Sequence, residues 1–199
     1  MLIAIILAAG RSSRMGRPKA LLPHADGVTT FVAYAIRTAR AAGVSTIVVV
    51  GRPGDDSLRA EAMREAALFV VNPDPDRGPL SSLVSGLDDA EDHDATAIMV
   101  MPVDLPAVSA EALKRLIDAA AASPLPIARA STNGAHGHPV IFKRAVFNEL
   151  RAADQSLGAR EVVRRDPSRV LDVEVGDTGV TLDVNTPEDY RRAFGRYCK

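Results

Sequence analysis

The chain has 199 residues, 47% of them hydrophobic and 25% charged, which is the balance of a globular protein with a buried core. This length suits one domain over residues 1–199 and leaves little room for a second catalytic domain. With 24 basic and 25 acidic side chains the net charge is −1, so composition argues against nucleic acid or an anionic membrane as a partner.

The cysteine content and the N-terminal stretch bear on the compartment. The single cysteine, Cys198, cannot form an internal disulfide, which fits a reducing environment. The apolar stretch 1–9 has no basic segment before it and is far short of the ~20 apolar residues that span a bilayer. We therefore expect a cytoplasmic protein whose first apolar stretch is a buried strand.

Short apolar runs alternate with helical patterns along the first two thirds of the chain. In chain order the predicted elements are a strand at 2–7, a helix at 29–42, a strand at 46–50, a helix at 55–66, a strand at 68–71, a helix face at 80–87, a strand at 97–103 and a helix at 109–122. Continuous apolar strands between helices indicate an α/β fold, with a mainly parallel sheet covered on both faces.

The last third of the chain is less regular. Here we predict strands at 127–130, 139–142 and 170–175, helices at 143–153 and 158–165, and a final helix that starts at Pro187. The stretch 131–137 is predicted to be a loop. His24 and His93 lie in polar stretches, so we expect both to be solvated.

The segment after the first strand combines small residues with cations. Small residues at 8–10 let backbone amides approach a ligand closely. Four cations follow within nine residues: Arg11, Arg14, Arg17 and Lys19. They repel one another unless an anion joins them, and amides with cations suit a polyphosphate. The pattern is neither Walker A nor the three-glycine dinucleotide motif. It indicates a distinct phosphate-binding loop, with a solvated basic loop as the alternative.

Carboxylates near strand ends are candidate Mg²⁺ ligands. Asp104 directly follows the strand at 97–103, and Ser109 is better placed to cap the next helix. Asp183 and Asn185 precede the final helix, for which Thr186 is the predicted cap. Their i, i+2 spacing would point both side chains to one side of an extended segment, where they could complete a metal shell with Asp104. The alternatives are a turn aspartate and a local Asx turn.

Six segments, in their order, resemble the MobA-like NTP transferase family, which includes molybdenum cofactor cytidylyl- and guanylyltransferases. The first, Leu-Ala-Ala-Gly-Arg-Ser-Ser-Arg-Met-Gly at 7–16 followed by Pro-Lys at 18–19, is highly specific to that superfamily. The other five are 77–83, 103–106, 137–142, 154–160 and 183–189. The resemblance therefore extends over nearly the whole chain.

The resemblance implies a fold and a reaction. The fold would be a Rossmann-like three-layer sandwich with a mostly parallel mixed sheet, like the nucleotide-diphospho-sugar transferases. The reaction would move a nucleoside monophosphate from an NTP onto the phosphate of molybdopterin, with Mg²⁺ as cofactor and release of pyrophosphate. Ala9 resembles the cytidylyl branch and favours CTP, whereas Asn185 is like the guanylyl branch.

The resemblance also assigns roles to residues of this chain. The catalytic group would be Arg11, Lys19 and Asp104. The nucleotide would contact Leu7, Ala8, Ala9, Gly10, Arg14, Gly78, Ser81 and Ser82. The metal ligands would be Asp104 with Asp183 or Asn185, and the acceptor would meet His138 and Arg160. Two alternatives stay open: nucleotidyl transfer, guanylyl transfer included, to another small phosphorylated metabolite, and a non-catalytic cofactor-binding accessory protein for a molybdoenzyme.

Overall fold

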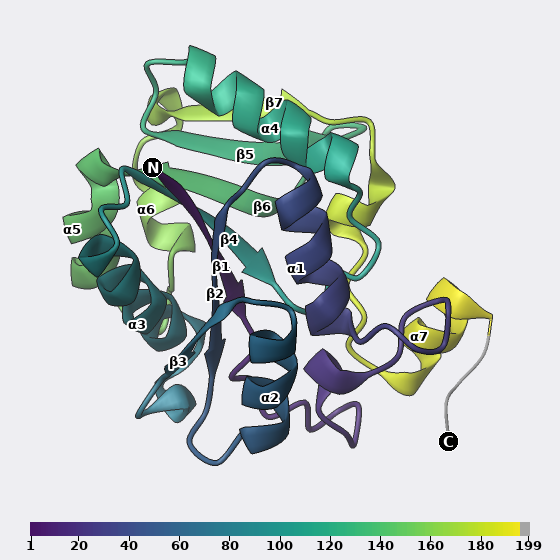
Figure 1. The fold of residues 1–199 in the computed structure, drawn as a ribbon. Helices are drawn as coiled ribbons and strands as arrows, with labels where there is room; N and C mark the ends of the chain where they lie inside the picture. Colours follow the sequence, from purple (N-terminus) through teal and green to yellow (C-terminus); the bar gives the residue numbers. More distant parts are fainter. Residues whose placement is uncertain (196–199) are drawn as a thin grey trace.

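A seven-stranded sheet lies between two layers of helices in the computed structural model, which describes residues 1–195 (Figure 1). The strands are β1 (Leu2–Leu7), β2 (Thr46–Gly51), β3 (Leu68–Val71), β4 (Ala97–Pro102), β5 (Ile127–Thr132), β6 (Ala135–Lys143) and β7 (Val170–Glu174). Their order across the sheet is β3-β2-β1-β4-β6-β5-β7. Only β6 runs antiparallel to its neighbours, so the predicted mostly parallel mixed sheet is confirmed. Cys198 lies outside the described residues.

The helices divide between the two faces of the sheet. They are α1 (Phe31–Ala41), α2 (Asp56–Arg64), α3 (Pro79–Asp92), α4 (Ala110–Ala122), α5 (Phe147–Ala152), α6 (Arg160–Arg165) and α7 (Pro187–Phe194). One core contains α1, α2 and α4 with Ala4 and Ile6 of β1; the other contains α3, α5 and α6 with Ile3 and Ile5 (Figure 1). Alternate residues of one strand therefore serve opposite cores, as the period of a strand dictates. Within residues 1–195 the structure has no helix with the length and apolarity to cross a bilayer.

Side-chain caps set the helix starts that the sequence predicts. The Oγ1 of Thr30 accepts a hydrogen bond from the Ala33 amide at the start of α1, and Ser109 caps α4 in the same way. Thr186 and Asp189 form a reciprocal capping box at the start of α7, directly before Pro187. Each cap satisfies amides that would otherwise lack a partner in the first turn.

The predicted loop at 131–137 is wrong. Strand β5 continues to Thr132 and β6 begins at Ala135, so a two-residue turn joins them. Asn133 and Gly134 have φ values of 50° and 77°, the left-handed pair that a tight type I′ hairpin requires. The polar composition hid the strands, because Ser131 and Thr132 are buried although they are polar.

Two glycines let the segment after β7 pack against the sheet. A Cβ on Gly137 of β6 would lie 2.1 Å from the carbonyl oxygen of Val180, in the short helix η5 (Thr178–Thr181). A Cβ on Gly179 would lie 2.2 Å from the carbonyl oxygen of Ala107, in the turn after β4. Such distances leave room only for glycine, and they bring the chain before α7 close to the carboxyl end of β4.

Gly137→Ala is expected to lower the free energy of unfolding by about 3 kcal/mol, because the added methyl group meets a backbone carbonyl that cannot rotate away. Urea denaturation followed by circular dichroism measures the change. Gly10→Ala is the matched control, since its methyl group would meet no atom within 4 Å. Equal stability of Gly137→Ala and the wild type would show that this contact does not hold the segment in place.

Candidate active site

Side chains from three distant parts of the sequence meet beyond the carboxyl ends of β1 and β4. The Nζ of Lys19, from the loop after β1, donates to Oδ2 of Asp104 at 2.6 Å. It also donates to Oδ1 of Asn185 at 3.0 Å, across 166 residues of sequence. The side chains of Lys19 and Asp104 are only 14% and 22% exposed, so their attraction is only partly screened by water. The structure thus brings together the predicted phosphate loop and the predicted metal carboxylate.

The chain before α7 is hydrogen-bonded to the turn after β4. The amide of Val184 donates to the carbonyl oxygen of Asp104 at 2.8 Å, and the Val184 side chain is fully buried. Asp183 and Asn185 flank Val184, and Lys19 acts on both, since it donates to Asn185 and its charge lowers the pKa of Asp183. Asp183 is exposed and Asn185 is half-buried.

The charges on this edge of the sheet act on one another. The pKa of Asp183 is raised, first because the surrounding protein removes part of its hydration and second because the Asp104 carboxylate is near, while Lys19 and Arg160 oppose the rise. Burial lowers the pKa of His138, against the attraction of Asp104 and with help from Arg160, so His138 is neutral at neutral pH. The two predicted acceptor residues therefore each lie within electrostatic reach of one carboxylate, His138 of Asp104 and Arg160 of Asp183.

The oxygen donors fit a divalent cation that arrives with a phosphate ligand. Within residues 1–195, no group of three or more His, Cys, Asp or Glu side chains could hold a metal by itself. Asp104 and Asp183 nevertheless bring two carboxylates near one another, and the charge of Lys19 acts on both. Because Mg²⁺ is usually held by one or two carboxylates plus substrate phosphates, this pair suits such an ion.

The cations of the loop after β1 are distributed among internal partners. The guanidinium of Arg11 donates from Nε and Nη2 to the two carboxylate oxygens of Asp76, and Arg52 also bonds Asp76, at 3.2 Å. The pKa of Asp76 is lowered, mainly by the hydrogen bond from Arg11. Arg14 reaches Oδ1 of Asn185 at 3.0 Å. The mutual repulsion expected from the sequence is thus relieved by acceptors from other parts of the fold.

A cavity of about 230 Å³ lies between the loop after β1 and the start of α2. Arg11 and Lys19 line one side, and Arg52 and Asp55 line the other. Arg52 and Asp55 were not predicted as site residues, although they follow β2 directly and the rule that ligands bind beyond strand ends applies to them as well. The amide of Arg52 donates to Asp55 at 3.0 Å, which folds this second loop back toward the first.

Residues 7–10, which are predicted to contact the nucleotide, differ in whether the sheet already pairs their backbone. Leu7 pairs with β2 and β4, and the amide of Ala8 donates to the carbonyl oxygen of Val50. Ala9 is buried, whereas Gly10 is exposed with open space around it. Amides that could approach a phosphate therefore begin at Ala9 and Gly10, with Leu7 and Ala8 holding them on the sheet.

Gly78 and the two serines after it form the start of α3. Gly78 has a φ of 106° and precedes Pro79, so it sets the direction in which the helix begins. Ser81 and Ser82 are buried, and both hydroxyls lie within hydrogen-bond distance of Nδ2 of Asn72, at 2.9 and 3.0 Å. In this structure the serines fix the turn after β3, and their contact with a nucleotide stays a prediction.

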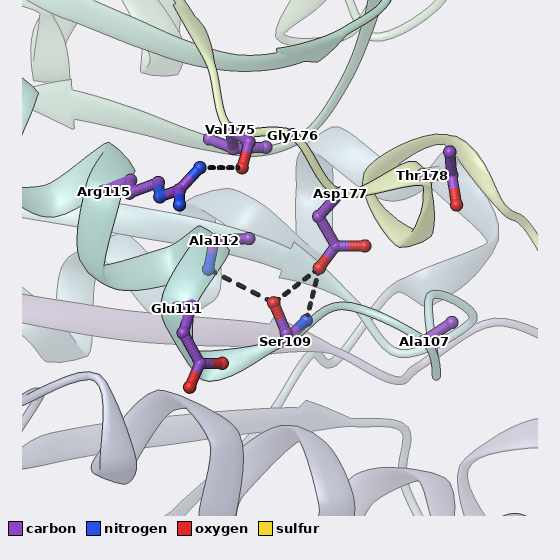
Figure 2. Close-up of a pocket in the computed structure, with 9 residues that line it drawn as sticks. All are labelled: Ala107, Ser109, Glu111, Ala112, Arg115, Val175, Gly176, Asp177 and Thr178. Carbon is purple, nitrogen blue, oxygen red and sulfur yellow. Dashed lines mark hydrogen bonds between the residues drawn. The ribbon is translucent and has the colours of Figure 1, made fainter.

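A second hollow, of about 390 Å³, lies away from these residues at the start of α4 (Figure 2). Figure 2 shows Asp177 accepting hydrogen bonds from the amide and the hydroxyl of Ser109, at 2.8 and 2.6 Å. Burial would raise the pKa of Asp177, but these bonds and one from the Gly179 amide together hold it below its ordinary value. The carboxylate already occupies the helix start, so we assign this hollow a structural role.

Asp177→Ala is expected to lower the free energy of unfolding by about 2 kcal/mol at pH 7, because partly buried donors lose a charged acceptor. The folded pKa is depressed, so the stabilisation is present above the unfolded pKa of about 3.9 and is lost as the pH falls through the folded pKa. Urea denaturation at pH 7, 4 and 3 should show that the difference in unfolding free energy between variant and wild type is constant down to about pH 4 and becomes smaller at pH 3. Glu111→Ala, an exposed change on the same hollow, is the control, and a gap independent of pH would contradict the argument.

His24 is not solvated, contrary to the expectation from its polar surroundings. Its ring stacks on Tyr34 with centroids 4.1 Å apart, and its Nε2 lies 2.7 Å from the carbonyl oxygen of Pro106. Phe194 of α7 packs on its edge. This cluster ties the loop after β1 and helix α7 to the turn that carries Asp104.

Comparison with known proteins agrees with this geometry. The family model described as MobA-like NTP transferase domain matches residues 4–170. The chain is 29% identical to purine catabolism protein PucB of Bacillus subtilis (97% of each chain) and 26% identical to the molybdenum cofactor cytidylyltransferase of Escherichia coli (97% of this chain, 95% of that one). The crystal structure of Rv0371c from Mycobacterium tuberculosis superposes with a TM-score of 0.81 at 34% identity, covering 98% of this chain and 97% of that one. A structure of Rv0371c in complex with manganese gives 0.75 at 32% identity, covering 98% of each chain.

Proposed function

Because the chain belongs to the MobA-like NTP transferase family and is a nucleotidyltransferase, we propose that it transfers CMP from CTP onto the phosphate of a molybdopterin-type acceptor with release of pyrophosphate. The observation that carries this proposal is the contact of Lys19 with Asp104, which joins the predicted phosphate-binding loop to the predicted metal carboxylate. A protein that only carried the cofactor would need neither a phosphate-binding loop nor a metal carboxylate. Membership of this family therefore favours an enzyme over a carrier.

Arg11 and Lys19 would bind the triphosphate of the nucleotide. Their present partners, Asp76 and Asp104, are carboxylates, and phosphate oxygens can accept the same charge-assisted hydrogen bonds. On nucleotide binding both cations would turn to the triphosphate, joined by the amides at Ala9 and Gly10. They would then stabilise the negative charge that grows on the leaving pyrophosphate.

The acceptor phosphate would be bound by His138 and Arg160, the two residues predicted for it. An oxygen of the acceptor phosphate attacks the α-phosphorus, and the bond from that phosphorus to the bridging oxygen of pyrophosphate breaks. The attacking phosphate is already an anion, so the site needs no strong general base. Arg160 would bind its charge, and the neutral imidazole of His138 would position it. Asp104 and Asp183 would hold Mg²⁺, which when bound neutralises charge on the phosphates.

The choice of CTP rests on whole-chain likeness as well as on Ala9. The E. coli cytidylyltransferase aligns over 97% of this chain. The segments Gly137-His138-Pro139 and Gly158-Ala159-Arg160 resemble the same branch, which is supported by the electrostatic interaction of His138 with both Asp104 and Arg160. Guanylyl transfer, or transfer to another small phosphorylated metabolite, is the competing reading, because Asn185 is like the guanylyl branch.

The experiment measures pyrophosphate release with CTP, GTP, ATP and UTP, each with Mg²⁺, Mn²⁺ or EDTA and with or without molybdenum cofactor. We expect release only when CTP, a divalent cation and the cofactor are all present. A thermal-shift series with the same nucleotides reports the base independently, since selective binding raises the Tm. Preference for GTP would correct the base, and no turnover under any condition would overturn the proposal.

A further inference from the structure

A charged pair lies on the strands beyond β6, the strand that carries the predicted acceptor residue His138. Arg129 of β5 and Asp172 of β7 stand opposite one another in the parallel pairing of these strands, and Nε of Arg129 donates to Oδ1 of Asp172 at 2.8 Å. Two residues before them, Ile127 and Val170 pack into the core with α3, α5 and α6. Because side chains two apart in a strand share a face, the charged pair lies on that same face of the sheet.

His136 connects this pair to the predicted acceptor site. Its Nε2 lies 3.4 Å from Oδ2 of Asp172. Along β6 it is two residues from His138, on whose pKa the charge of Asp104 acts. Polar side chains therefore continue from Asp104 across β6 to Arg129 and Asp172. An acceptor whose phosphate is bound at His138 would have this charged pair within reach of its remaining atoms.

The pair offers two unlike groups to a ligand. The hydrogen bond from Arg129 lowers the pKa of Asp172, although burial opposes this, so the carboxylate is charged at neutral pH. Its Oδ1 binds the guanidinium, whereas Oδ2 is farther from His136 than the about 3 Å of an ordinary N–H···O bond. The Asp172 side chain is 42% exposed, so a ligand can reach it. A carboxylate beside a guanidinium is complementary to a planar ring edge that presents N–H donors next to a carbonyl oxygen.

We propose that Asp172 and Arg129 bind the aminopyrimidinone edge of the acceptor's pterin ring, with Asp172 accepting from its amino group and ring N–H and Arg129 donating to its carbonyl oxygen. This rests on the proposed function, because the pterin is the part of a molybdopterin-type acceptor that carries such an edge. The pair selects the ring, whereas His138 and Arg160 would bind the phosphate. An ion pair at the surface adds little to stability, so a substitution here tests recognition and not folding.

The test compares free pterin with lumazine, the same ring system with an oxygen in place of the amino group. Binding of each to the full-length chain is measured from the fluorescence of the ring, without nucleotide. The wild type should bind pterin about 10-fold more tightly, because a site built for an N–H donor rejects a ring that lacks it. Asp172→Asn should remove the preference, since an amide has one acceptor oxygen and its NH₂ group suits lumazine. Asp88→Asn, which alters another aspartate paired with an arginine, is the control and should keep the preference.

Equal affinity of the wild type for the two rings, or binding of neither, would overturn the proposal, as would a preference for pterin that persists in Asp172→Asn. The comparison within the wild type needs no variant, so it decides even if Asp172→Asn alters the fold. In kinetics with the molybdenum cofactor, Asp172→Asn should raise KM for the cofactor about 10-fold and leave KM for CTP unchanged. A wild type that prefers pterin but releases no pyrophosphate would refute the proposed reaction and support the ring assignment.

Discussion

Asp104→Asn should lower kcat for pyrophosphate release about 10³-fold, because the carboxylate that would hold the metal loses its charge while the side chain keeps its shape. A bound metal ion contributes several kcal/mol of charge stabilisation in the transition state, and each 1.36 kcal/mol is a factor of ten in rate. The fold should persist, since the backbone carbonyl of Asp104 still accepts from Val184. Steady-state kinetics with CTP, Mg²⁺ and the cofactor measure the loss, and circular dichroism measures the fold.

The control for this variant is Asp118→Asn on α4. Asp118 is an exposed aspartate that pairs with Lys114 one helical turn away, so its neutralisation removes the same charge without touching the site. It should retain wild-type kcat. If Asp104→Asn also retained it, Asp104 would have no part in the mechanism and the metal would have to bind elsewhere.

The fold was predictable to a large extent because its signals are local. Apolar runs of strand length, separated by helices with capping residues, suffice to predict a covered parallel sheet. The failure at 131–137 has the same local origin. Asn133-Gly134 is a strong hairpin signal, but the polar residues beside it do not alternate in the way that marks a half-buried strand.

The site was predictable in its parts and not in its assembly. The loop after β1 and the turn at Asp104 follow from the rule that ligands bind beyond strand ends. No local pattern shows that Lys19 would reach Asp104 and Asn185 together, because those contacts join positions 85 and 166 residues apart. Asp76 was missed for the same reason, since its part in the site comes only from the hydrogen bonds that it accepts from Arg11 and Arg52.

Lys19→Met should lower kcat/KM for the nucleotide about 10²-fold, because the charged donor that would bind the phosphates is replaced by an apolar chain of similar length. Lys114→Met, which removes an exposed lysine from its pair with Asp118, should leave kcat/KM unchanged. Initial-rate kinetics over a range of CTP concentrations measure both. A variant at Lys19 with wild-type kcat/KM would exclude this lysine from triphosphate binding.

The same substitution should have the opposite effect on the metal alone. In this structure the ammonium of Lys19 lies 2.6 Å from the carboxylate of Asp104 and also acts on the charge of Asp183. A divalent cation that binds without nucleotide must compete with that ammonium, so its removal frees the carboxylates and raises their mutual repulsion. Lys19→Met should therefore bind Mn²⁺ more tightly than the wild type in the absence of nucleotide, and gain more Tm from it. Weaker Mn²⁺ binding would contradict this competition. It would mean that Lys19 stabilises the metal site even before the nucleotide binds.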